Sequence, residues 1–159
     1  MSDVLIPYKY SRFAHFTSLF ILRNAHILYT NGFSVIGTLS YLCYIFTNLH
    51  WYRLRSSGYI RNIDITIVIS IFILSLYEAY KYDCYTQYIY GTTISIGAFA
   101  FNESLNSLSL YSQEFSNMGE RKKHYTYLRC VLIHTFFLHI FQMELGGYVT
   151  TCKNRYTHQ

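Results

Sequence analysis

Three histidines and one aspartate are the residues whose types and spacing suggest chemistry in this sequence. His50 closes one long apolar run, Asp64 opens the next, and His134 and His139 lie inside a third. Histidine nitrogens with a carboxylate can hold zinc and leave a position open for water, whose pKa falls to about 7 on the metal. One hypothesis is therefore a metal-assisted hydrolase, with Asp64 as the catalytic group and His50, His134 and His139 as metal ligands.

Each of these residues also has an ordinary structural interpretation. His50 suits the interface between a membrane and water. Asp64 can cap the start of its helix and pair with Arg61, three residues earlier. His134 and His139 can form hydrogen bonds between helices, which polar side chains inside a membrane do readily. From the residues alone, both interpretations stay open.

The apolar runs that carry these residues indicate an all-α, multi-pass transmembrane helical bundle. Hydrophobic residues make up 52% of the 159-residue chain and charged residues 13%, against a usual charged share of about 25%. A helical bundle buried in water is the alternative. We expect one membrane domain over residues 1–159, with spans at about 28–49, 60–78, 85–102 and 127–145, an N-terminal interfacial helix over 13–22, and a polar tail over 146–159.

The expected second span places Asp64 just inside the membrane. The uncharged stretch between Asp64 and Glu78 is too short to cross a hydrocarbon core of about 30 Å at 1.5 Å per residue. On a helical wheel Asp64, Ser75 and Glu78 fall on one side, which suggests a polar stripe and a proton or ion pathway. Four spans would place both termini on one side, and would bring His50, Asp64 and His134 to the opposite face.

The charge distribution indicates lipid rather than nucleic acid as a partner. The net charge is +5, and the basic residues form short clusters beside apolar runs instead of a continuous stripe. Such clusters contact anionic lipid headgroups. The residues expected to do so are Arg53, Arg55, Arg61, Arg121, Lys122 and Lys123.

Common soluble enzyme and metal motifs are missing from the sequence. It contains no Gly-rich phosphate loop, no H-E-x-x-H and no G-x-S-x-G. The four cysteines form no C-x-x-C pair, which excludes a zinc ribbon or a thioredoxin motif. Cys84 and Cys152 fall on the same side of the expected bundle, so a disulfide between them would require that side to be oxidising.

The segment Thr47-Asn48-Leu49-His50, together with Asp64 and His134, resembles the motifs of one membrane family. The alkaline ceramidase and progestin/adiponectin-receptor superfamily of membrane hydrolases carries Ser-x-x-x-His at a helix end, Asp at the start of the next helix, and His-x-x-x-His on its last helix. The resemblance implies zinc-dependent cleavage of a lipid amide or ester. Here His134 and His139 are five residues apart rather than four, which separates them by about 140° on an α-helix.

Three functional expectations follow. The first is a non-enzymatic membrane or envelope component, or an accessory subunit with protein partners in the membrane and no cofactor. The residue usage is similar to that of small multi-pass membrane proteins of large DNA viruses. The second expectation is a reduced, ceramidase-like zinc hydrolase, and the third is a component of a proton or ion pathway.

Overall fold

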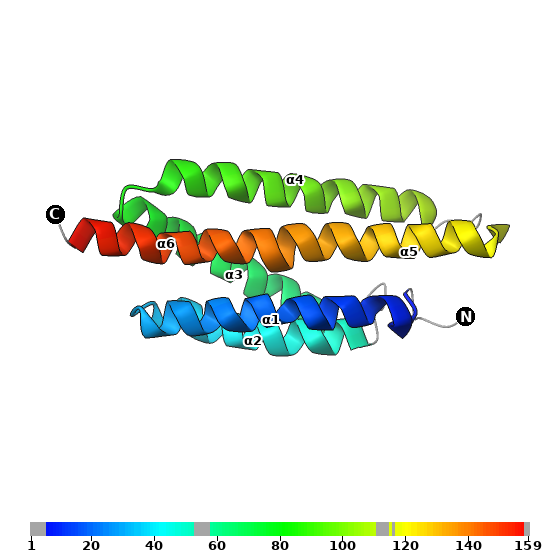
Figure 1. Cartoon of the computed structure of the whole chain (residues 1–159), viewed down its shortest axis with the longest axis horizontal. Coiled ribbons are helices and arrows are strands. Elements are labelled where there is room, and N and C mark those ends of the chain that lie inside the picture. Colours follow the sequence, from blue (N-terminus) through cyan, green and yellow to red (C-terminus); the bar gives the residue numbers. More distant parts are fainter. Residues whose placement is uncertain (1–5, 53–57, 111–114, 116, 158–159) are drawn as a thin grey trace.

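The protein is an all-α bundle of long helices. The computed structural model describes residues 6–52, 58–110, 115 and 117–157. Within these residues the helices are α1 (Tyr8–Thr30), α2 (Ser34–Tyr52), α3 (Tyr59–Lys81), α4 (Tyr85–Ser109), α5 (Glu120–His134), the π-helix η2 (Thr135–Phe141) and α6 (Gln142–Thr157). The segments α5, η2 and α6 follow one another without a break and form one rod (Figure 1). The expected all-α class is therefore confirmed.

The rod lies between the α1–α2 hairpin and α4, and α3 crosses behind it (Figure 1). Helix α1 begins at the end of the bundle where α5 begins, and α6 ends at the other end (Figure 1). The expected arrangement, with four long helices, would bring the first and last helices to the same end. The difference arises because α1 is one more long helix than expected.

The first helix is longer and more deeply packed than the sequence suggests. We expected a short interfacial helix over 13–22, whereas α1 extends over 23 residues. Its polar side chains Ser11, Thr17, Ser18 and Asn24 are buried against other helices. Those polar residues lower the hydropathy of the segment, although their side chains are packed inside the bundle.

The hairpin between α1 and α2 is tight because two glycines allow it. Gly32 has a φ of +82°, a left-handed conformation that glycine adopts without strain. A Cβ at Gly37 would lie 2.8 Å from the backbone nitrogen of Tyr29, so only glycine permits this approach. Lys153 of α6 donates a hydrogen bond to the carbonyl of Asn31 at 2.6 Å, which ties the far end of the rod to the hairpin turn.

The sequence suggests that the last helix ends at Gly146, but the helix continues beyond this residue. The predicted polar tail over 146–159 is helical through Thr157. A Cβ at Gly146 would lie 2.9 Å from Nδ2 of Asn24, so this glycine provides room for α1 instead of stopping the helix. Along the rest of the rod, residues 127–145 are helical as expected, with the π-helix in their middle.

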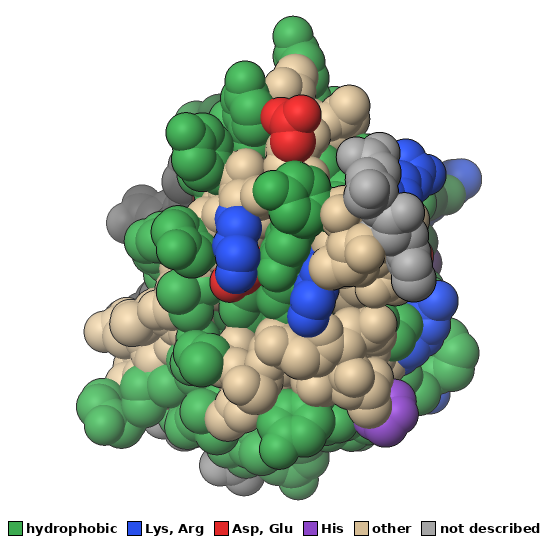
Figure 2. All heavy atoms as spheres, turned by 90° about the vertical axis from the view of Figure 1, so that its left-hand side faces the viewer, with side chains coloured by type: hydrophobic (Ala, Val, Ile, Leu, Met, Phe, Trp, Pro, Cys, Tyr) green, Lys and Arg blue, Asp and Glu red, His purple; other side chains and the backbone are tan. Residues whose placement is uncertain are grey.

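The bundle buries many polar side chains beside its hydrophobic core and exposes many large apolar ones. Helical positions with strongly exposed apolar side chains include Leu19, Ile45, Ile69, Ile73, Ile94 and Phe136. Buried polar positions include Ser40, Thr47, Asp64, Ser95, Asn102, Asn106, His139 and Gln142. Seen from the end where α6 finishes, hydrophobic side chains cover much of the outline, and charged side chains lie both on the end face and along one edge (Figure 2).

Within the described ranges, two helices are long and apolar enough to cross a membrane by length and composition. They are α3, Tyr59–Lys81, and the rod, Glu120–Thr157. The four described cysteines are free and buried, Cys84 and Cys152 among them.

Candidate functional site

A polar cavity of ≈ 60 Å³ lies between α2, α3, α4 and α5. His50 reaches it from the last turn of α2, Asp64 from the start of α3, and His134 from the end of α5. The structure thus brings together three of the four residues that the sequence singled out. Arg61 and Glu103 also line this cavity.

Asp64 is held by a hydroxyl from the neighbouring helix. Oγ1 of Thr47 donates a hydrogen bond to Oδ1 of Asp64 at 2.7 Å, and both side chains are buried. Thr47 also lies 3.7 Å from the thiol sulfur of Cys43, one turn earlier on α2. The carboxylate therefore links α2 to α3 inside the bundle.

His134 and His139 meet because the helix between them is wider than an α-helix. On an α-helix, residues five apart point about 140° away from each other. In η2 the backbone follows the π-helical pattern, in which hydrogen bonds join residues five apart. The two rings consequently lie with their centroids 5.2 Å apart and their planes at 83°. The prediction that these two histidine side chains point away from each other is therefore wrong, because the helix between them is a π-helix.

His139 forms an interhelical hydrogen bond instead of reaching the polar cavity. Its Nδ1 lies 3.0 Å from Oγ1 of Thr17 on α1, and the ring is buried. A second contact between helices lies nearby on α1 and α2. There Nδ1 of His15 is 2.7 Å from Oδ1 of Asn48, and the amide of Asn48 donates to Ser18 at 3.0 Å. These contacts match the structural interpretation of His139.

The described side chains do not fit a zinc centre. Within the described ranges, no three histidine, cysteine, aspartate or glutamate side chains gather closely enough to hold one metal ion. His134 instead packs its ring against Trp51, with centroids 4.8 Å apart, and Asp64 is engaged by Thr47. The roles suggested for His50, Asp64, His134 and His139 in metal-assisted hydrolysis stay predictions, and the geometry offers no step through a metal.

An apolar cavity of ≈ 270 Å³ adjoins the polar one. It shares Asp64, Ile65, Phe99 and His134 with the polar cavity and extends along α3 and α4. Most of its lining is aliphatic or aromatic: Ile21, Val68, Ile69, Phe72, Ile96, Leu138 and Met143 complete the apolar part. The two cavities together therefore change from polar to apolar along the bundle.

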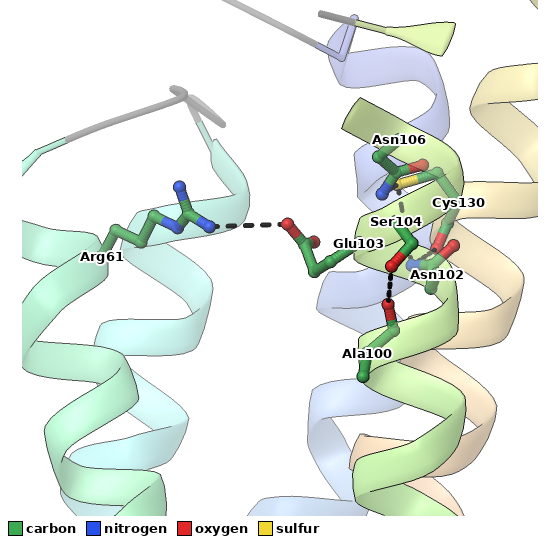
Figure 3. A network of polar contacts seen from close by, with 7 residues as sticks. All are labelled: Arg61, Ala100, Asn102, Glu103, Ser104, Asn106 and Cys130. Atoms are coloured by element: carbon green, nitrogen blue, oxygen red, sulfur yellow. Dashed lines mark hydrogen bonds and ion pairs between the residues drawn. The ribbon is translucent and has the colours of Figure 1, made fainter. Parts of the chain in front are cut away.

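Sequence reasoning missed Trp51, Asn102, Asn106 and Cys130, which also line the polar cavity. The side chain of Trp51 is only 2% exposed. Asn102 and Asn106 are one turn apart on α4, and that spacing within a stretch poor in charge was the available signal. Both amides donate toward Cys130, from Asn102 to its carbonyl at 3.1 Å and from Asn106 to its sulfur at 3.1 Å (Figure 3).

Two buried polar atoms of this cavity have no hydrogen-bond partner in the described part of the chain. They are the indole Nε1 of Trp51 and the amide Oδ1 of Asn102. The indole nitrogen is a hydrogen-bond donor, and the amide oxygen is an acceptor. At the mouth, Nη2 of Arg61 lies 3.6 Å from Oε2 of Glu103, and the two side chains point toward each other from α3 and α4 (Figure 3).

The expected stripe of Asp64, Ser75 and Glu78 is not continuous. Asp64 and Ser75 belong to the buried face of α3, but Ile67 and Ile71 occupy the same face between them. Glu78 is only partly buried and lies 4.0 Å from Lys81, one turn later. A proton or ion pathway along these residues remains a prediction, and the packing of α3 gives it little support.

The expected lipid-contacting residues fall into three groups. Arg53 and Arg55 lie outside the described residues. Arg61 contributes to the polar cavity. At the start of α5, Arg121 and Lys122 are exposed and line a shallow surface groove together with Arg129. Lys123 lies beside them, 3.7 Å from Glu120.

Comparison of the chain with protein-family models, with curated proteins and with solved structures found no match in any of the three.

Proposed function

We propose that this chain is an integral, multi-pass membrane protein that acts as a non-enzymatic membrane component. The observation that carries the proposal is the distribution of its side chains. Every long helix carries large apolar residues that are exposed, whereas a number of serine, threonine and asparagine side chains, together with His139, are buried between helices. A protein that folds in water has the reverse tendency. Within a bilayer this distribution is favourable, because lipid covers the apolar surface and polar groups pair between helices.

The proposal assigns five passes to the chain: α1, α2, α3, α4 and the rod. Only α3 and the rod meet simple criteria of length and apolar composition. The other three helices also bury polar side chains, such as Thr17 and Asn24 on α1, Ser40 on α2 and Asn102 on α4.

A non-enzymatic role is supported by the bonds that the chemically capable residues make. Asp64 accepts a hydrogen bond from Thr47, His139 pairs with Thr17, and His15 pairs with Asn48. Each of these contacts joins two helices. The polar residues thus serve to hold the bundle together, as buried polar groups in membrane proteins do.

The proposal is tested by membrane extraction and by topology mapping. The full chain, expressed with a tag at either end, should stay in the membrane pellet after alkaline carbonate washing and dissolve only in detergent. Five passes place the two termini on opposite sides, so a membrane-impermeant protease should remove one tag from sealed vesicles and spare the other. Release by carbonate would refute membrane integration, and equal access to both tags would refute five passes.

A further inference from the structure

The polar and apolar cavities adjoin inside the bundle and share four lining residues. We propose that together they bind a single-chain amphiphile whose small, uncharged head carries a hydroxyl group, such as a protonated fatty acid or a long-chain alcohol. This inference rests on the proposed function, because the apolar cavity has to open toward lipid for such a ligand to enter.

The head of the ligand is identified by the two unpaired atoms. Nε1 of Trp51 can only donate and Oδ1 of Asn102 can only accept a hydrogen bond. Their side chains are 2% and 1% exposed, so bulk water does not satisfy them. A buried polar atom without a partner is unfavourable. A hydroxyl group can accept a hydrogen bond from an indole N–H and donate one to an amide oxygen, so its chemistry matches both of these cavity-lining side chains.

The size and charge of the polar cavity restrict the head further. A volume of ≈ 60 Å³ holds about two groups the size of a water molecule, which excludes a phosphodiester headgroup. Arg61 and Glu103 at the mouth contact each other at 3.6 Å, so opposite charges lie together there. The site therefore favours a small neutral head.

The tail of the ligand is identified by the apolar cavity. Ile69 of α3 and Ile96 of α4 line this cavity, and they are 51% and 49% exposed. The cavity thus reaches the outer surface between these two helices. Its volume of ≈ 270 Å³, together with the ≈ 60 Å³ of the polar cavity, lies at the lower end of the ~300–1,000 Å³ range of small-ligand pockets. One hydrocarbon chain can enter from the bilayer and lie along α3 and α4.

The single tryptophan of the chain makes the site directly observable. Trp51 is the only tryptophan and lines the polar cavity, so its fluorescence reports on this place alone. The full chain is reconstituted in vesicles of unbrominated phospholipid and titrated with a long-chain fatty acid brominated near its carboxyl group. We expect quenching that saturates and that the unbrominated acid reverses. The methyl ester of the same brominated acid lacks the hydroxyl donor and should bind about five- to tenfold more weakly.

Two matched variants test the path of the tail. Ile96→Phe fills the apolar cavity, whereas Ile94→Phe adds the same bulk two residues away, at an exposed position outside it. We expect Ile96→Phe to weaken saturable quenching by about tenfold or more and Ile94→Phe to leave it unchanged, since only the first removes space from the cavity. Asn102→Leu should abolish the difference between the acid and its ester, provided that the variant keeps the helical circular dichroism of the wild type.

The proposal is overturned if quenching rises linearly without saturation, if the unbrominated acid does not reverse it, or if the two phenylalanine variants behave alike. Any of these results would mean that ordered water, or no ligand, fills the cavity. Failure of the proposed function is distinguished by carbonate extraction, which tests membrane integration without reference to the cavity. A protein that remains in the membrane but shows no saturable quenching refutes this inference alone.

Discussion

The rings of His134 and His139 lie with their centroids 5.2 Å apart, almost perpendicular, although an α-helix would separate them by about 140°. The π-helix between them produces this contact, and it also directs His139 toward Thr17 on α1. At this local change in backbone geometry His134 lines the polar cavity, whereas His139 lines the apolar cavity and contacts Thr17. π-Helices occur frequently at functional sites.

The hydrogen bond between Thr17 and His139 should stabilise the packing of α1 on the rod. Thr17→Val removes the hydroxyl that contacts Nδ1 of the buried His139 ring, so we expect a loss of about 0.6–2 kcal/mol in the free energy of unfolding. This loss is measured by unfolding the detergent-solubilised protein with increasing concentrations of sodium dodecyl sulfate. The control is Thr30→Val, because Thr30 is exposed and bonds only within its own helix. An equal loss in both variants would contradict a role for His139.

The contact between Thr47 and Asp64 should depend on an acceptor at position 64 rather than on its charge. Asp64→Asn keeps a carbonyl oxygen for the Thr47 hydroxyl, whereas Asp64→Leu leaves that hydroxyl unpaired. We therefore expect the leucine variant to be the less stable by about 1 kcal/mol or more in the same unfolding assay. In a Thr47→Val background the difference should shrink. A difference that persists there would assign the effect to another neighbour of Asp64.

Two glycines of α4 should respond in opposite ways to alanine. A Cβ at Gly91 would overlap the side chain of Leu145 on the rod, and a Cβ at Gly97 meets no atom within 4 Å. Gly91→Ala should cost about 1–3 kcal/mol through overpacking, while Gly97→Ala should be neutral or stabilising by up to about 1 kcal/mol, since alanine favours helix. The two variants are compared by the melting temperatures of the purified proteins. Similar losses at both positions would mean that α4 packs differently against the rod.

Zinc should not bind stoichiometrically to the purified protein. The described residues provide no group of three ligands, and Asp64 is occupied by Thr47. Elemental analysis after detergent purification in zinc-containing buffer should give well under one ion per chain, equal in the wild type and in His134→Ala. One zinc per chain that disappears in His134→Ala would instead support the ceramidase-like hypothesis.

The basic start of α5 should retain anionic lipid. Arg121 and Lys122 are exposed beside Arg129, and each basic residue near an anionic surface contributes about 1 kcal/mol. Replacing Arg121 and Lys122 together by glutamine should reduce the anionic phospholipid that copurifies, measured by native mass spectrometry. The matched change is Arg155→Gln, an exposed basic residue on α6 near the opposite end. Equal losses from both changes would show that the groove has no special role.

The comparison of sequence and structure shows which inferences depended on local pattern alone. Apolar runs and their helical period were enough to predict an all-α chain and most helical segments. They also placed His50, Asp64 and His134 at one end, because each residue lies near a helix end that the order of the helices brings together. Helix α1 was underestimated because hydropathy counts a buried serine or asparagine as though it faced water.

By itself, the sequence determined the helical class, the positions of the apolar faces and the proximity of His50, Asp64 and His134. Only the tertiary structure decided that His139 turns toward Thr17, that Gly146 makes room for Asn24, and that Trp51 and Asn102 line a common cavity. The physical reason is the distance along the sequence over which each interaction acts. Helix formation and amphipathicity depend on neighbours a few residues away, whereas a π-helix, a close helix contact and an unpaired buried atom depend on what another helix places opposite them.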